Sequence, residues 1–224
     1  MLAALAALVA VALLSRPAAS AGQDAASTAS ASDLRPEINR WLIPYGKKRK
    51  KDMAGYSNRH YGKREWRLEH PKQIVEHISV TRTARQVYNT FAPNRPDVEY
   101  GELPGVCAHF VVSPKGNIFK LVPVAIRCRH TVGLNHLSIG IEHVGYSDGD
   151  LLGNKRMFKR SLRLTRYLRC RFDIKVKNVI GHNESLSSPF YKELDPDFRG
   201  RTHGDMRTSS MASYRRKLFK LGGC

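Results

Sequence analysis

Acidic residues are scarce in this chain of 224 residues. Asp and Glu number 19 against 38 Lys and Arg, which gives a formal net charge of +19. A charge of this size predicts a polyanionic partner: nucleic acid, acidic lipid or an anionic cell-wall polymer. The sequence lacks a basic stripe interleaved with aromatic residues, the pattern on which single-stranded nucleic acid stacks. We therefore expect no nucleic-acid partner.

Cysteine is also rare, and its spacing excludes one class of metal site. The four cysteines, Cys107, Cys128, Cys170 and Cys224, form no C-x-x-C pair. A structural zinc site built on sulfur is therefore not expected. Cys107 and Cys128 flank one predicted hairpin and are the best candidates for a disulfide, with buried free thiols as the alternative.

The apolar run at the start of the chain is short. It extends from Leu2 to Leu14, which is too short for a comfortable membrane span. Ala19-Ser20-Ala21 follows it and has the A-x-A pattern of a secretory cleavage site. No cysteine follows the run directly, which argues against a lipoprotein anchor. We expect residues 1–21 to be a signal peptide and the protein to be secreted, periplasmic or extracellular. An uncleaved anchor helix is the alternative.

Composition divides the rest of the chain into two parts. Residues 22–35 are rich in Ala, Ser, Asp and Thr, as in a linker, and residues 36–65 contain the pentabasic run Lys47 to Lys51. We interpret residues 22–65 as a flexible basic arm that adheres to anionic polymer. A nuclear signal or a nucleic-acid contact is the alternative reading of the pentabasic run. Residues 66–224 are long enough for one ordinary domain.

From residue 72 onward, strand patterns alternate with helix patterns. Period-2 alternation or short apolar runs predict strands over residues 74–80, 106–112, 118–122, 138–145 and 176–180. Helices are predicted over residues 83–91, 155–172 and 207–221. Strands separated by helices indicate a mixed α/β domain, with a single central β-sheet and helices on both faces.

One predicted strand carries a residue that does not suit burial. The stretch SIGIEHVG, Ser138 to Gly145, alternates isoleucines with Gly140 and then presents Glu142. A carboxylate on an apolar strand is costly unless a charge or hydrogen bond meets it. Glu142 either pairs with an arginine at the sheet edge or takes part in chemistry. His77 and His182 lie in or just after other strands, where rigid backbone suits metal ligands.

Four segments, taken together, resemble one enzyme family. They are IVEHISVT, CAHFVVSPKGNIFKLVP, RHTVGLNHLSIGIEHVG and VIGHNES. Their order and spacing, from about residue 72 to 218, are similar to those of the zinc-dependent N-acetylmuramoyl-L-alanine amidases, a group that includes the peptidoglycan recognition proteins. The resemblance implies that residues 66–224 form a catalytic domain of that fold. It also implies Zn²⁺ as cofactor and hydrolysis of the amide between N-acetylmuramic acid and L-alanine in peptidoglycan. A non-catalytic peptidoglycan-binding module is the alternative.

The resemblance also implies a metal site. Histidines that match His77 and His182 bind zinc in the family, and a third ligand follows on a loop. In the family this ligand usually stands in the pattern K-x-D-P, two residues after a lysine and directly before a proline. The sequence departs from the pattern here: Asp195 precedes Pro196, whereas His203 lies two residues after the basic residue Arg201. We favour His203 as the third ligand and keep Asp195 as the alternative. A fourth position is left for water, as a catalytic zinc requires.

Further roles follow from the same resemblance. Glu142 matches the acid that serves as general acid and base, and Arg201 stands where the family stabilises the oxyanion. His130 matches a histidine of the substrate groove, with Asn135 beside it. We expect peptidoglycan, and possible anionic envelope polymers, as partners of a monomer.

Overall fold

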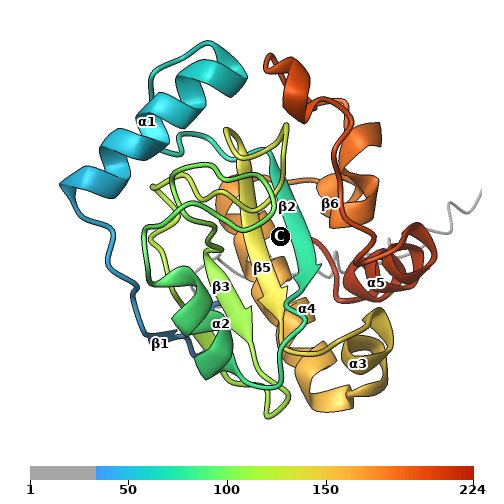
Figure 1. Cartoon of the computed structure of the whole chain (residues 1–224). Coiled ribbons are helices and arrows are strands. Elements are labelled where there is room, and N and C mark those ends of the chain that lie inside the picture. The colour runs from blue at the N-terminus through green and yellow to red at the C-terminus, as the bar shows by residue number, and fades with distance from the viewer. Residues whose placement is uncertain (1–33) are drawn as a thin grey trace, which may run out of the picture.

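The computed structural model describes residues 34–224, so the predicted signal peptide and the first part of the predicted arm lie outside the described residues. The described chain contains a six-stranded sheet of order β1-β4-β3-β5-β2-β6 (Figure 1). The strands are β1 Asn39–Arg40, β2 Gln73–Ile78, β3 Phe110–Val112, β4 Ile118–Lys120, β5 Ser138–His143 and β6 Val179–Gly181. The helices are α1 Lys47–Tyr61, α2 Ala84–Phe91, α3 Asp148–Gly153, α4 Lys155–Phe172 and α5 Thr208–Lys220. Three short 3₁₀ helices cover Val176–Asn178, His182–Ser187 and Pro196–Phe198.

The sheet is mixed, as predicted. β2 pairs in parallel with β5 on one side and with β6 on the other. β3 is parallel to β5 but antiparallel to β4, with which it forms a hairpin. In the β2–β5 register His77 lies opposite Glu142, so these two side chains point to the same face of the sheet.

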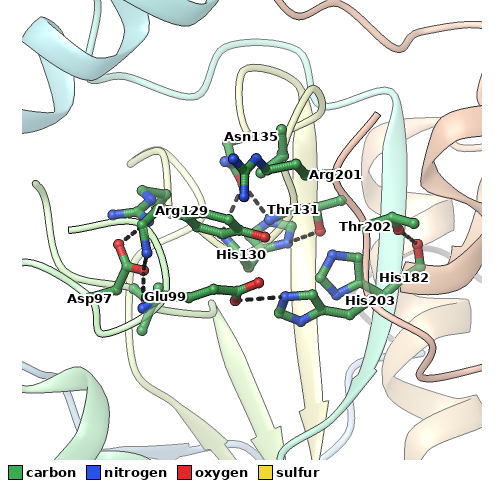
Figure 2. A pocket seen from close by; sticks show the side chains of 13 residues that line it. Asp97, Glu99, Arg129, His130, Thr131, Asn135, His182, Arg201, Thr202 and His203 are labelled. Atoms are coloured by element: carbon green, nitrogen blue, oxygen red, sulfur yellow. Dashed lines mark hydrogen bonds and ion pairs between the residues drawn. The ribbon is translucent and has the colours of Figure 1, made fainter. Parts of the chain in front are cut away.

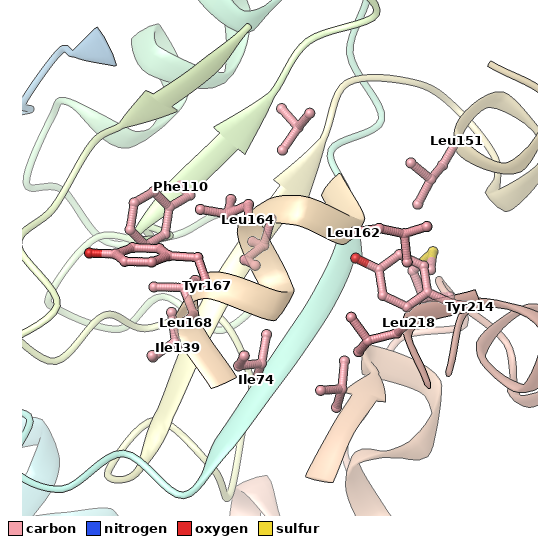
Figure 3. Packing of buried hydrophobic residues seen from close by; sticks show 14 of the residues in the cluster. Ile74, Phe110, Ile139, Leu151, Leu162, Leu164, Tyr167, Leu168, Tyr214 and Leu218 are labelled. Carbon is pink, nitrogen blue, oxygen red and sulfur yellow. The ribbon is translucent and has the colours of Figure 1, made fainter. Parts of the chain in front are cut away.

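Helices cover both faces of the sheet. Side chains of α4 and α5 form the larger core with the first face of the strands (Figure 3), and its members include Ile74, Phe110, Ile139, Leu164, Leu168, Tyr214 and Leu218. On the second face, Val87 and Phe91 of α2 pack with Val111 and Leu121. His77 and Glu142 belong to this second face, because they alternate with Ile78 and Ile141 of the first core.

The strongly periodic elements lie where the sequence predicts them. The helix predicted over residues 155–172 is α4, and the Asn154 side chain caps its start by accepting from the backbone N–H groups of Arg156 and Met157. The helix predicted over residues 83–91 is α2, with a capping box formed by Thr83 and Gln86. None of the helices in the described part of the chain is long and apolar enough to span a membrane.

All four cysteines are oxidised. Cys107 is bonded to Cys128, the pairing that the hairpin suggested, so buried free thiols are excluded. Cys170, near the end of α4, is bonded to Cys224 at the end of the chain. The second pair joins residues 54 positions apart and ties the C-terminus to α4.

The interpretation of residues 22–65 as a flexible arm is wrong for residues 47–61, which form α1. Arg49, in the middle of the pentabasic run, is buried, and its guanidinium donates to the backbone carbonyls of Phe91 (2.8 Å), Gly105 (2.9 Å) and Val106 (3.1 Å). Met53 lies one helical turn further on and is also buried. The charge of the run concealed this inward-facing stripe, because three of the other members, Lys47, Lys48 and Lys51, are exposed lysines.

Replacing Arg49 by lysine should destabilise the protein. A lysine ammonium cannot present the planar fork that serves these carbonyls, so buried acceptors lose their donors. We expect Arg49→Lys to lower the free energy of unfolding by about 2–3 kcal/mol in urea denaturation. Lys51→Ala on the exposed side is the control and should change it by less than about 0.5 kcal/mol. Equal effects of the two substitutions would contradict the structural role of Arg49.

Candidate active site

Three side chains from separate parts of the chain meet at the second face of the sheet. The Nδ1 atoms of His77 and His182 are 3.1 Å apart. The Oδ2 atom of Asp205 lies 3.6 Å from His77 Nδ1, and its Oδ1 atom lies 3.3 Å from His182 Nδ1. Two ligands about 2.0–2.1 Å from one tetrahedral zinc stand about 3.3 Å apart. These three side chains therefore fit one such ion.

Strand topology brings the two histidines together. His77 lies near the carboxyl end of β2, and His182 follows the last residue of β6, its parallel neighbour. Carboxyl ends of parallel strands open at one edge of a sheet, where ligands bind in open α/β folds. Asp205 comes from the segment before α5. Its carboxylate accepts from the N–H of Ile78 (3.0 Å), and its carbonyl accepts from the N–H of Asn183 (3.0 Å).

A glycine allows Asp205 to reach this position. A Cβ added to Gly181 would lie 1.8 Å from the carbonyl oxygen of Met206, a distance that no side chain tolerates. The segment after Asp205 therefore crosses directly over the end of β6. A larger residue at position 181 would push this segment, and Asp205 with it, away from the histidines.

The structure corrects the expected third member of the cluster. Asp205, and neither His203 nor Asp195, offers a ligand atom within 4.8 Å of those of both histidines. The ring of His203 lies beside that of His182, with centroids 4.7 Å apart, and lines the same cavity. The Nε2 atom of His203 instead bonds to the Glu99 carboxylate at 2.9 Å (Figure 2). Asp195 accepts from the N–H of Asp197 and caps the 3₁₀ helix that follows. Sequence reasoning passed over Asp205 because Met206, not proline, follows it.

Glu142 faces the cluster from β5. It lines the same cavity of about 390 Å³ as His77, His182 and Asp205. Its Oε2 atom is buried and has no hydrogen-bond partner in the described chain, and no arginine pairs with it there. Burial raises the pKa of Glu142 to about 7, although the charge of His77 opposes the rise. The carboxyl can therefore exchange a proton near neutral pH.

The protonation states of Asp205 and His182 suit a cation site, whereas burial of His77 is outweighed by the nearby Asp205 and Glu142 carboxylates, which raise its pKa. Burial raises the pKa of Asp205, but hydrogen bonds from His182 and His77 outweigh it and keep the pKa well below its usual range. Burial lowers the pKa of His182 to about 4, despite the nearby Asp205, so this imidazole is neutral as a metal ligand must be. The site thus combines a fixed carboxylate with at least one imidazole whose nitrogen lone pair is available.

His130 extends the cluster and explains the glycine of the S-I-G-I-E stretch. Its Nδ1 atom lies 3.1 Å from His77 Nε2. A Cβ at Gly140 would lie 2.7 Å from the His130 ring, so only glycine lets the ring lie against β5. His130 also lines the cavity, as a substrate contact would require.

Asn135 lines a small cavity that His130 and Arg201 also line (Figure 2), and its expected contact with substrate stays a prediction. This residue is fully buried, and its Oδ1 accepts from the N–H groups of His130 and Thr131, both at 2.8 Å. Its Nδ2 donates to the hydroxyl of Tyr56 on α1 at 3.0 Å. Asn135 therefore holds the His130 turn in place, and it links that turn to α1.

Arg201 lies at the rim of the site. It lines a small cavity with His182 and His203 (Figure 2). Its guanidinium lies over the ring of Tyr100, 5.0 Å from the centroid. The side chain is exposed, so it is accessible to a substrate in the groove. Its expected role at the oxyanion stays a prediction.

Comparison with known families decides the classification. Residues 67–197, more than half of the chain, match the family described as N-acetylmuramoyl-L-alanine amidase. The chain belongs to this family. The match ends before Asp205, so the third member of the cluster comes from the structure of this amidase and not from the family match.

Solved structures agree on the fold of this amidase. A selenomethionine derivative of AmpD is similar with a TM-score of 0.52 and 20% identity, over 81% of this chain and 94% of that chain. The catalytic domain of XlyA has a TM-score of 0.52 and 16% identity, over 82% and 99%. PlyL has a TM-score of 0.52 and 14% identity, over 82% and 97%. Comparison with curated proteins gives no significant match.

Replacing Gly181 by alanine should damage both the fold and the site. The added methyl group meets the backbone oxygen of Met206, which cannot yield without moving the Asp205 segment. We expect Gly181→Ala to lower the free energy of unfolding by about 1–3 kcal/mol or more. Gly153→Ala on α3 is the matched control, because a Cβ there meets nothing within 4 Å. Equal urea midpoints for the two variants would contradict the close crossing.

Proposed function

We propose that this amidase is a secreted zinc hydrolase that cleaves the amide between N-acetylmuramic acid and L-alanine in peptidoglycan. Two observations support the proposal: membership of the family, and the close approach of His77, His182 and Asp205. Two imidazoles and one carboxylate are a common ligand set of catalytic zinc, and they leave a fourth position open. The approach of these three side chains is the observation that carries the proposal.

The protein side chains would divide the work at this site. Zinc, when bound by His77, His182 and Asp205, would polarise the scissile carbonyl and acidify an attacking water. Glu142 accepts the water proton at its carboxylate and then donates it to the leaving amine. Burial raises the pKa of Glu142 and so favours its protonated form, and a neighbouring cation would favour the carboxylate again. His130 and Arg201 would contact the substrate from the small cavity that both of them line.

Secretion and retention at the envelope belong to the same proposal. Two disulfides suit an oxidising compartment, which agrees with the signal-like N-terminus. The net charge of +19 would hold the enzyme near anionic envelope polymers, and the outer side of α1 presents Lys47, Lys48 and Lys51.

Metal content and amine release from purified peptidoglycan test the proposal together. The wild-type protein should bind one zinc and release amines. Asp205→Ala should lose the zinc, because one of three ligands is removed. Glu142→Gln should keep the zinc and lose about 10²–10⁴-fold of the activity, because only the proton carrier is removed.

His203→Ala and Asp195→Ala are the matched controls and should both retain the zinc. If either control variant lost its zinc while Asp205→Ala retained it, the residue replaced in that control, His203 or Asp195, would be the third ligand. A wild-type protein that holds one zinc and releases no amine at any pH between 5 and 9 would indicate a peptidoglycan-binding module instead of an enzyme.

A further inference from the structure

Asp148 lies outside the histidine cluster but contacts the backbone that carries Asp205. It is the first residue of α3 and is only 5% exposed. One carboxylate oxygen accepts from the N–H of Met206 at 2.8 Å, and the other accepts from the N–H of Arg207 at 2.9 Å. These are the two residues that follow Asp205 in the chain. A single side chain thus fixes the turn on which Asp205 is carried.

This turn needs an external support. Met206 has φ +53°, a left-handed conformation that costs a non-glycine residue about 1 kcal/mol or more. α5 begins two residues later, and its N-cap residue, Arg207, makes no side-chain capping bond. The first N–H groups of a helix require acceptors. Asp148, on α3, accepts from the N–H of the N-cap residue Arg207 and from the N–H of Met206, so it holds the strained residue at the entrance to α5.

The carboxylate form of Asp148 suits this task. Burial opposes its ionisation, but hydrogen bonds from Ser210, Arg207 and Met206 outweigh burial and lower its pKa. Two oxygens are needed, because the two N–H groups are bound by different atoms. An asparagine at this position would offer one acceptor in place of two.

Among residues 34–224, three sets of hydrogen bonds from outside the cluster restrain Asp205 or the turn after it, and one of them comes from a side chain, that of Asp148. The N–H of Ile78 binds the carboxylate of Asp205, and the N–H of Asn183 binds its carbonyl. Both of those donors are backbone groups. We infer that Asp148 is a positioning residue of the metal centre, which sets the place of the Asp205 carboxylate without touching the ion. This inference rests on one part of the proposed function, namely that His77, His182 and Asp205 bind zinc.

Zinc affinity tests this inference without measuring activity. The metal-free full chain is titrated with zinc against a chelating dye of known affinity. Mutation of a residue that orients metal ligands without binding the metal typically weakens metal affinity by about 10–100-fold. We expect Asp148→Asn to weaken zinc binding about 10-fold. Asn154→Ala is the matched control: it removes the side-chain cap of α4, should also lower the melting temperature, and should leave zinc affinity within about twofold.

The cobalt(II) form provides a second measurement. Its visible absorption spectrum reports the number and geometry of the ligands, which a purely stabilising role of Asp148 would not alter. We expect the spectrum of Asp148→Asn to differ from wild type and that of Asn154→Ala to coincide with it. If Asp148→Asn fails to fold, Asp148→Glu keeps the charge and moves both oxygens by one methylene, and the same weakening is expected.

The outcomes separate this inference from the proposed function. Tight zinc binding by wild type and equally tight binding by Asp148→Asn, even with a lower melting temperature, would overturn the positioning role and leave the zinc site intact. Absence of zinc binding in wild type would overturn both. Weaker binding in Asp148→Asn together with unchanged binding in Asn154→Ala would establish the role.

Discussion

The parallel ladders on both sides of β2 are the constraint on which the site depends. β5 places Glu142 directly opposite His77, and β6 ends opposite Glu76, so that His182 emerges beside the same strand. A shift of the register by one residue would turn His77 toward the apolar core under α4, because side chains alternate between faces. The apolar residues on the first face therefore fix the polar residues on the second. Packing against α4, far from the cavity, determines which side chains can meet a cation.

The first face also contains a polar network directly behind the site. Glu76 accepts from Thr165 of α4 at 2.8 Å, and His143 of β5 lies 2.7 Å from the hydroxyl of Ser161. His143 Nδ1 donates to the backbone carbonyl of His77 at 2.9 Å. Burial raises the pKa of Glu76 to about 7 and lowers that of His143 to about 4, so both side chains can be neutral. Buried polar groups are tolerated when hydrogen-bonded, although the Oε2 atom of Glu76 has no hydrogen-bond partner in the described chain. Within this network, His143 fixes the main chain of His77 from the far side of the sheet.

Local sequence patterns predicted most of the secondary structure. Sequence patterns located α4 and five of the six strands, but β1 lies in the segment predicted as an arm, β3 begins only at Phe110, and residues 176–178 form a 3₁₀ helix before β6. The family resemblance identified His77, His182 and Glu142, which the sheet brings to one cavity. It did not predict Asp205, because that choice depends on a crossing of two backbones at Gly181. Which residue of a loop reaches a site is a tertiary property, and spacing from a basic residue is only an indirect guide to it.

The helix that composition had indicated as a solvated arm is a wall of the active-site domain. Tyr56 of α1 reaches Asn135, which holds the backbone of His130. At the end of α1, His60 is buried between the carboxylates of Glu102 and Glu193, both within about 3 Å. Burial opposes its charge, but these two acids raise its pKa, and through them the imidazole joins three segments of the chain. A charged segment is therefore solvated only when no face of it carries residues at helical spacing that can be buried. In α1 such a face exists and consists of Arg49, Met53, Tyr56 and His60.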